Sequence, residues 1–149
     1  QAVIASGLPY QIIVPNNIYG PRQINHFVDE FIARAKKGDV ELFGWDNTRS
    51  WLYIEDFTEA MERLIHCKDA VGEKINIGSN DEVEVLKLAE VIIGKMGIDK
   101  PIVKHDAPAG SVQRRMPDIT KLQTLTEWQP VTSLEDGLTK TVKYWMEQK

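Results

Sequence analysis

Short apolar runs alternate with longer amphipathic segments along this 149-residue chain. The short runs have the length of strands, and the longer segments repeat apolar residues every three or four positions, as helices do. Strands that alternate with helices predict an α/β arrangement. The expected strands cover residues 10–14, 40–43, 51–54, 73–77 and 101–104, and the expected helices cover 25–37, 56–66, 83–96, 118–125 and the stretch that follows residue 133.

Three polar residues are expected to begin helices as N-caps: Asp56, Asp118 and Ser133. Their side-chain oxygens can accept hydrogen bonds from the unpaired amides of a first helical turn. Residues 46–48 are expected to form a turn, and residues 105–117, which contain prolines and a glycine, an irregular loop. No composition shift marks a linker, so residues 1–149 are expected to form one unit.

Composition excludes several classes of protein. The apolar fraction of 42% and the charged fraction of 27% are those of a globular protein. A net charge of −4 argues against nucleic-acid binding. No apolar run approaches the roughly 20 residues of a membrane span. The single cysteine, Cys67, excludes an internal disulfide and favours a reducing compartment, so a cytoplasmic location is expected. The three histidines lack metal-ligand spacing, and no metal site is expected.

An amide-rich turn follows the first expected strand. Asn16 and Asn17 follow this apolar run after Pro15, and Gly20, Pro21 and Arg22 come next. Open α/β sheets bind ligands at the carboxyl ends of their strands. Amide and guanidinium donors there suit an anionic, polyhydroxylated ligand. The alternative is that these residues only form a turn.

Arginines and aromatic residues supply further candidates. Arg22, Arg49 and the Arg114-Arg115 pair lie in loops or at strand starts, where they can contact a diphosphate through bidentate hydrogen bonds. The alternative is that they are surface residues paired with local acids. Phe43 and Trp45 surround a glycine turn and can flank a flat base, or can simply pack in the core.

Two sequence elements of a dinucleotide-dependent oxidoreductase are absent. The glycines form no Gly-x-Gly-x-x-Gly, so the phosphate-binding loop of a dinucleotide fold is missing from the sequence. No tyrosine is followed four positions later by a lysine. No Ser-His-Asp arrangement can be argued from spacing, and no catalytic residue is predicted in this chain.

The chain nevertheless resembles the C-terminal portion of the extended short-chain dehydrogenase/reductases that modify nucleotide sugars. The resemblance runs in order along almost the whole chain and rests on a series of motifs. They are Asn17-Ile18-Tyr19-Gly20-Pro21, Arg49-Ser50-Trp51-Leu52-Tyr53-Ile54-Glu55-Asp56, Asn76-Ile77-Gly78, Arg115-Met116-Pro117-Asp118-Ile119-Thr120-Lys121, Trp128-Gln129-Pro130 and Leu134-Glu135-Asp136-Gly137-Leu138.

The resemblance implies a fold and a role for each candidate. The fold would be the last elements of a Rossmann-type enzyme with a small substrate-binding subdomain, lacking the N-terminal half that binds most of the NAD. Such enzymes oxidise the sugar of a nucleotide-diphosphate sugar to a 4-ketone. The residues implied at the substrate are Asn17, Phe43, Arg49 and Arg115, with Arg22 and Arg114 as further candidates; those implied at the border of the cofactor are Asn16, Tyr19 and Pro21.

The reaction itself stays open between epimerase, 4,6-dehydratase and decarboxylase. Ser50 replaces the family's usual aspartate and favours UDP-glucuronate decarboxylases, whereas Asn16-Asn17 favours the 4,6-dehydratases. We expect the isolated chain to be inactive and to associate with itself or with the missing half. The alternative is a non-catalytic module that binds a nucleotide sugar or a partner protein. Because the first residue is Gln1, the chain is expected to be a fragment or a processed product.

Overall fold

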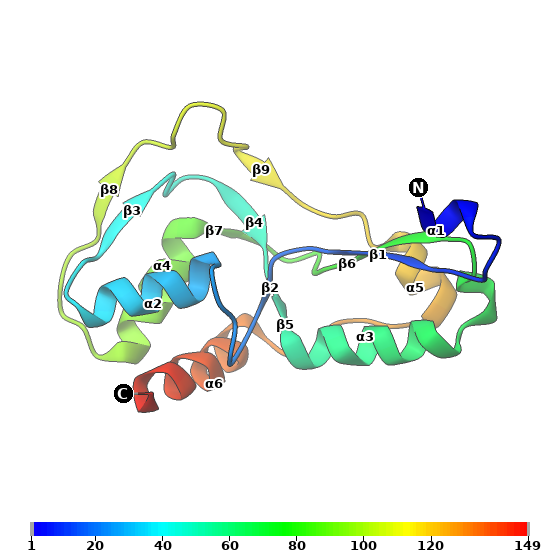
Figure 1. The fold of residues 1–149 in the computed structure, drawn as a ribbon. Coiled ribbons are helices and arrows are strands. Elements are labelled where there is room, and N and C mark those ends of the chain that lie inside the picture. Colours follow the sequence, from blue (N-terminus) through cyan, green and yellow to red (C-terminus); the bar gives the residue numbers. More distant parts are fainter. Residues whose placement is uncertain (1, 149) are drawn as a thin grey trace.

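The computed structural model describes residues 2–148 and confirms the predicted α/β class. Its elements form two packed groups, joined near the middle of the molecule (Figure 1). In chain order they are α1 Ala2–Ala5, β1 Ile12–Pro15, β2 Ile18–Tyr19, α2 Phe27–Lys36, β3 Glu41–Phe43, β4 Thr48–Ser50, β5 Leu52–Tyr53, α3 Ile54–His66, β6 Lys74–Ile77, β7 Glu82–Glu84, α4 Val85–Met96, β8 Val103–His105, β9 Arg114–Arg115, α5 Thr120–Thr126 and α6 Leu134–Glu147.

The first group, which we call the sheet lobe, contains β1, β6, α3 and α5. Strands β1 and β6 pair in parallel, with Ile13 opposite Ile75. Helices α3 and α5 pack on each other, and α5 also packs on β6. Trp128 is the largest buried side chain of this lobe. The three apolar residues of β1 are only half-buried, because within residues 2–148 β1 pairs with a single strand.

The second group, the helical lobe, contains α2, α4 and α6 with the parallel pair β3–β8. The helix expected over residues 25–37 is confirmed as α2, and the apolar repeat of that segment is buried, with Phe31 and Ile32 packed against α4 and α6. Gly38 follows α2 with a φ of +84°, a left-handed conformation that glycine adopts without strain. Leu88 and Ile92 of α4 complete the centre of this core.

Short strands connect the two lobes. Strand β2 pairs in parallel with β5, placing Ile18 beside Leu52. Strand β4 lies at the centre of a three-stranded sheet, antiparallel to β7 and parallel to β9. Four of these strands, β2, β4, β7 and β9, were not predicted: β4 replaces part of the expected turn, and β9 lies inside the expected loop. Strands of two or three residues are too short to show a period in the sequence.

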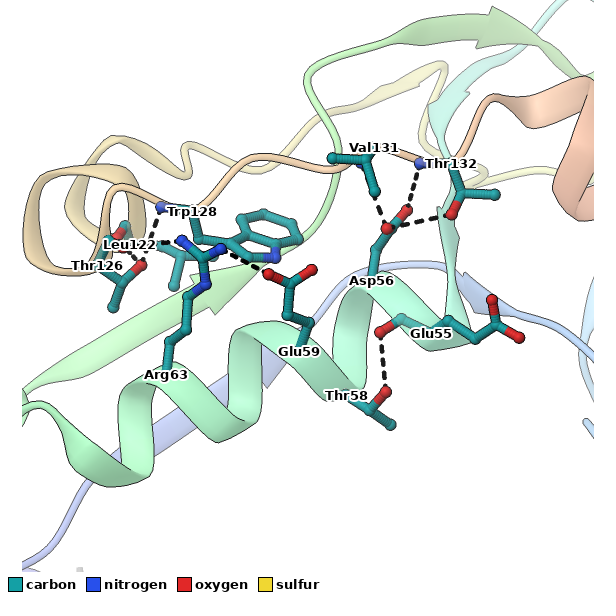
Figure 2. Close-up of polar contacts among 10 residues, drawn as sticks. All are labelled: Glu55, Asp56, Thr58, Glu59, Arg63, Leu122, Thr126, Trp128, Val131 and Thr132. Atoms are coloured by element: carbon teal, nitrogen blue, oxygen red, sulfur yellow. Dashed lines mark hydrogen bonds and ion pairs between the residues drawn. The ribbon is translucent and has the colours of Figure 1, made fainter.

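Asp56 was predicted to be the N-cap of α3, and that prediction is wrong. The helix begins two residues earlier, at Ile54, and Asp56 lies in its first turn with 2% of its surface exposed. Its carboxylate accepts hydrogen bonds from the backbone amides of Val131 and Thr132, at 3.3 and 3.1 Å, and from the Thr132 hydroxyl at 3.2 Å (Figure 2). The Asp56 carboxylate, which the local pattern assigned to the first amides of α3, therefore accepts a hydrogen bond from Val131, seventy-five positions away.

Of the other two predicted N-caps, Ser133 is confirmed, whereas Asp118 lies one residue before the observed N-cap of α5, Ile119. Ser133 is the N-cap of α6, and its hydroxyl accepts a hydrogen bond from the Asp136 amide at 3.1 Å. Asp118 precedes α5 by two residues, and its carboxylate accepts the Thr120 amide at 2.9 Å. Hydrogen bonding with the Thr120 side chain, and next this bond to its amide, hold the pKa of Asp118 below its ordinary value. Nearby, Arg63 of α3 contacts Glu59 and the Thr126 carbonyl at the end of α5 (Figure 2).

Replacing Asp56 with alanine tests the importance of its buried carboxylate. We expect Asp56→Ala to lower the free energy of unfolding by about 2–3 kcal/mol, because backbone amides bonded to a buried charge would lose their partner. Urea denaturation measures the change. Glu55→Ala is the matched control, since Glu55 is an exposed neighbour in an exposed ion pair with Lys140, and such pairs contribute at most about 1 kcal/mol. Equal effects of the two substitutions would contradict the assigned role.

Candidate functional site

Three segments meet where β1 and β6 end. The Asn16 amide donates to the Ile77 carbonyl at 2.9 Å, which extends the β1–β6 pairing by one residue. Gly78 follows β6 and is buried. A Cβ at this position would lie 2.6 Å from Pro117 Cγ and 3.2 Å from Asn16 Cβ, so only glycine permits this close approach. The carboxyl ends of two parallel strands and the segment after β9 therefore form one continuous edge.

Asn17 connects this edge to the strands between the lobes. Its Nδ2 donates to the Ser50 carbonyl at 2.8 Å, and its own carbonyl accepts the Leu52 amide at 3.2 Å. Its φ of +44° is a left-handed conformation that asparagine tolerates better than most residues. One Nδ2–H is used internally, so the side-chain oxygen and the second Nδ2–H remain for a ligand. Asn16 likewise uses Nδ2, which donates to the Val14 carbonyl at 3.1 Å.

Arg49 on β4 is placed next to Arg115 on β9. The two residues are paired in register on adjacent parallel strands. The Arg49 guanidinium donates to the carbonyls of Thr48 and Gln113, at 2.7 and 3.0 Å, and to that of Val112. Partial burial lowers the pKa of Arg49, and the charge of Arg115 lowers it further. Two like charges on neighbouring strands favour a bound anion.

Arg114 and Arg115 have different surroundings although they are adjacent. Arg114 forms a two-fold contact with Glu82 of β7, with nitrogen–oxygen distances of 2.8 and 3.0 Å. That contact lowers the pKa of Glu82 and raises the pKa of Arg114. The Arg115 side chain is exposed and has no hydrogen-bond or ion-pair partner among residues 2–148. Of this pair, Arg115 is thus the residue whose charge is open to a ligand, and Arg114 has the acidic partner that the surface alternative requires.

The structure does not bring Arg22 to the same place. Arg22 has a left-handed φ of +66° and lines a separate hollow of about 330 Å³ at the start of the segment after β2. Pro21 and His26 line the same hollow, together with Ile54 at the beginning of α3. The idea that all three arginine positions contact one diphosphate is therefore replaced by a pair, Arg49 and Arg115.

The two aromatic candidates, Phe43 and Trp45, lie in different surroundings. Phe43 is 52% exposed and stacks on His105, with ring centroids 4.7 Å apart and planes 18° apart. One ring face is thus covered by β8, and more than half of the surface remains available for stacking. Trp45 packs against the core of the helical lobe, and Lys104 Nζ lies 4.7 Å from its ring centroid. The core-packing alternative therefore applies to Trp45.

Tyr19 was expected to border the cofactor, but in the structure it lies inside the packed interior. Its side chain is 2% exposed, and its hydroxyl donates to the Leu134 carbonyl at 3.4 Å. Burial raises the pKa of Tyr19 far above its ordinary value. The ring packs on Tyr53 and against Gly137, where a Cβ would collide with the Tyr19 hydroxyl. The side chain therefore belongs to the contact between α6 and the short strands.

Within residues 2–148, no group of three His, Cys, Asp or Glu side chains could hold a metal ion. No helix in that range is both long enough and apolar enough to cross a bilayer.

Comparison with known proteins places these features in a family. A family model described as GDP-mannose 4,6 dehydratase matches residues 4–141. The chain belongs to this family, one of NAD-dependent nucleotide-sugar epimerases and dehydratases. Its fold is that of the C-terminal portion of the Rossmann-type short-chain dehydrogenase/reductases in this class.

Two curated relatives and one solved structure illustrate the match. The chain is 35% identical over 143 residues to the low-salt glycan biosynthesis protein Agl12 of Haloferax volcanii, covering 93% of this chain and 46% of the relative. It is 34% identical to a UDP-N-acetyl-alpha-D-glucosaminuronate decarboxylase of Bacillus cytotoxicus, covering 95% of this chain and 47% of the relative. A UDP-glucuronic acid 4-epimerase of Bacillus cereus, solved with UDP-glucuronic acid and NAD, superimposes with a TM-score of 0.84 at 26% identity.

That superposition covers 98% of this chain and 48% of the epimerase. The chain thus spans about half the length of the relatives it matches.

The Glu82–Arg114 contact generates a pH prediction. Because the pKa of Glu82 is lowered in the folded state, its ionised carboxylate stabilises the fold above the ordinary value of 4.5. That contribution is lost as the pH falls through the lowered folded-state pKa. We expect the unfolding free energy of the wild-type chain to fall more steeply below pH 4.5 than that of Glu82→Gln. Urea denaturation at a series of pH values measures both, and parallel profiles would contradict the contact.

Proposed function

We propose that this chain is the nucleotide-sugar-binding portion of an NAD-dependent enzyme that works through a 4-keto sugar intermediate. The observation that carries the proposal is the pairing of Arg49 with Arg115 in register on adjacent parallel strands. Arg114 is balanced by Glu82, so this pair carries the excess positive charge of the site. A diphosphate would supply the missing negative charge and accept bidentate hydrogen bonds from each guanidinium.

The neighbouring residues support an orientation for the ligand. Phe43 lies on β3 and precedes the turn that leads into β4, so a base stacked on its open face would lie on one side of the arginine pair. Asn17 lies on the other side, through its hydrogen bond to Ser50. We therefore propose that the base contacts Phe43, the diphosphate contacts Arg49 and Arg115, and the sugar approaches Asn17.

The residues present fit only one edge of a cofactor site. NAD, when bound, would accept the hydride from the sugar C4. Asn16 and Pro21 lie in the segment that begins at the carboxyl end of β1, where α/β sheets bind such ligands. Their contribution would be to border the cofactor and substrate, since the chain has no glycine-rich phosphate loop of its own. We therefore propose that the 149 residues alone are inactive and that a preceding half of the enzyme binds most of the NAD.

The sheet lobe supports the proposed partnership with that half. Exposed apolar side chains are found on α1, on the segment that follows it, and around the end of α3: Val3, Ile4, Leu8, Ile65 and Val71. Ile65 and Val71 line a hollow with Pro9, Tyr10 and Gln11 at the entrance to β1. We propose that upstream Rossmann strands and helices cover this surface. The single cysteine supports a reducing compartment, and we propose the cytoplasm as the place of action.

Calorimetric titration of the 149-residue chain tests the nucleotide-sugar proposal. We expect UDP-glucuronate, UDP-glucose or dTDP-glucose to bind, and Arg115→Ala or Arg49→Ala to weaken binding by about 1–3 kcal/mol, the usual contribution of a hydrogen bond to a charged group. Arg34→Ala is the control, because Arg34 contacts Asp39 and the Glu41 carbonyl away from the arginine pair. Binding that both site substitutions leave unchanged would overturn the proposed site.

Sedimentation analysis tests the uncovered surface of the sheet lobe. We expect the isolated chain to associate with itself increasingly as its concentration rises, because exposed apolar area favours association. Ile65→Asn should reduce that association. Ile24→Asn is a matched control, since Ile24 is 67% exposed and Ile65 is 68% exposed, but Ile24 lies in the segment between β2 and α2. A monomer at every concentration, or equal effects of both substitutions, would contradict the prediction.

A further inference from the structure

The connection between β8 and β9 runs along the outside of the molecule. Residues 106–113, which we call the strap, arch beyond β3 and β4 in Figure 1, where they appear in yellow-green. All of them except Ala107 are exposed. One hydrogen bond lies within the strap, from the Ser111 amide to the Pro108 carbonyl at 3.0 Å. Its attachment to the rest of the chain is therefore concentrated at its end.

Arg49 makes most of that attachment. Its guanidinium donates to the strap carbonyls of Val112 and Gln113, and the Thr48 amide donates to the same Gln113 carbonyl at 2.9 Å. An arginine has five N–H donors in a fixed plane. Both N–H groups of Nη1 are used, because this nitrogen donates to the carbonyls of Thr48 and Gln113. Nη2 donates once, to Val112, so Nε–H and one Nη2–H have no acceptor among residues 2–148.

The unused donors belong to a group that already faces a second positive charge. Arg115 is in register with Arg49 and has no acidic partner in the described chain. Burial and this neighbouring charge lower the pKa of Arg49. An anion beside Arg115 can therefore accept from Nε and Nη2 of Arg49 while the same side chain keeps its bonds to the strap.

We propose that Arg49 links the strap to the bound anion, so that binding of a diphosphate orders residues 106–113. The inference rests on the proposed function and extends it from the site to a neighbouring segment. Arg49 acts in two ways: part of its guanidinium contacts the ligand, and the other part positions the strap. A lysine at position 49 retains the charge but lacks the planar set of donors needed for both contacts.

Hydrogen exchange of the 149-residue chain with and without UDP tests this coupling. In the wild type, we expect saturating UDP to slow exchange in peptides that cover 106–115 by roughly three- to tenfold, the factor expected for one net hydrogen bond. In Arg49→Lys, UDP at matched saturation should leave that exchange unchanged. Arg115→Lys is the matched comparison: it should bind UDP more weakly, and bound UDP should still slow exchange in the strap.

The outcomes separate the coupling from the proposed function. If UDP binds but does not slow exchange in the strap, or slows it equally in Arg49→Lys, the coupling is wrong and the nucleotide site stands. If UDP does not bind at all, the proposed function fails for the isolated chain. The attachment is then judged without ligand: Arg49→Lys should speed exchange in 111–115 relative to wild type, and unchanged exchange would overturn the inference.

Discussion

The arrangement of the two lobes depends on one buried carboxylate. Asp56 lies on α3, in the sheet lobe, whereas Val131 and Thr132 lead directly into α6, the last helix of the helical lobe. Its three hydrogen bonds fix where α6 begins, and the Tyr19 hydroxyl bonded to Leu134 reinforces that position from β2. Strands β2 and β5 bury Tyr19, Leu52 and Tyr53 in the cores of the two lobes, and these polar contacts add a directional constraint to that packing.

The electrostatics of the candidate site follow from strand pairing. Parallel pairing of β4 with β9 sets Arg49 beside Arg115, while antiparallel pairing of β4 with β7 brings Glu82 to Arg114. One arginine is thereby neutralised, and two remain next to each other. The same pairing attaches the segment before β9 to Arg49 through backbone carbonyls. Anion binding and the order of that segment thus depend on the same few hydrogen bonds.

The long elements were predictable because their signals are local. The apolar stripe of α2 and the serine cap of α6 were both found from spacing and residue type. The short strands β3, β5 and β8 were also found, because they lie in or beside apolar runs, whereas β2, β4, β7 and β9 were not, because two or three residues among polar and turn-forming neighbours show no pattern. Asp56 shows the second source of error: a carboxylate near a helix start is a good cap, but here a tertiary partner uses it.

The α/β class, the approximate positions of the long helices, and a set of polar and aromatic residues for the site could all be predicted from the sequence alone. Its ordered motifs also indicated the family, which the comparisons show. How those residues combine depends on the tertiary structure. Arg49 is in register with Arg115, and Arg114 forms an ion pair with Glu82. Arg22 lies at a separate hollow, and Tyr19 is buried. The physical reason is that register, burial and the choice of hydrogen-bond partner depend on contacts between residues far apart in the sequence, 32 positions for Arg114 and Glu82 and 64 for Arg49 and Gln113.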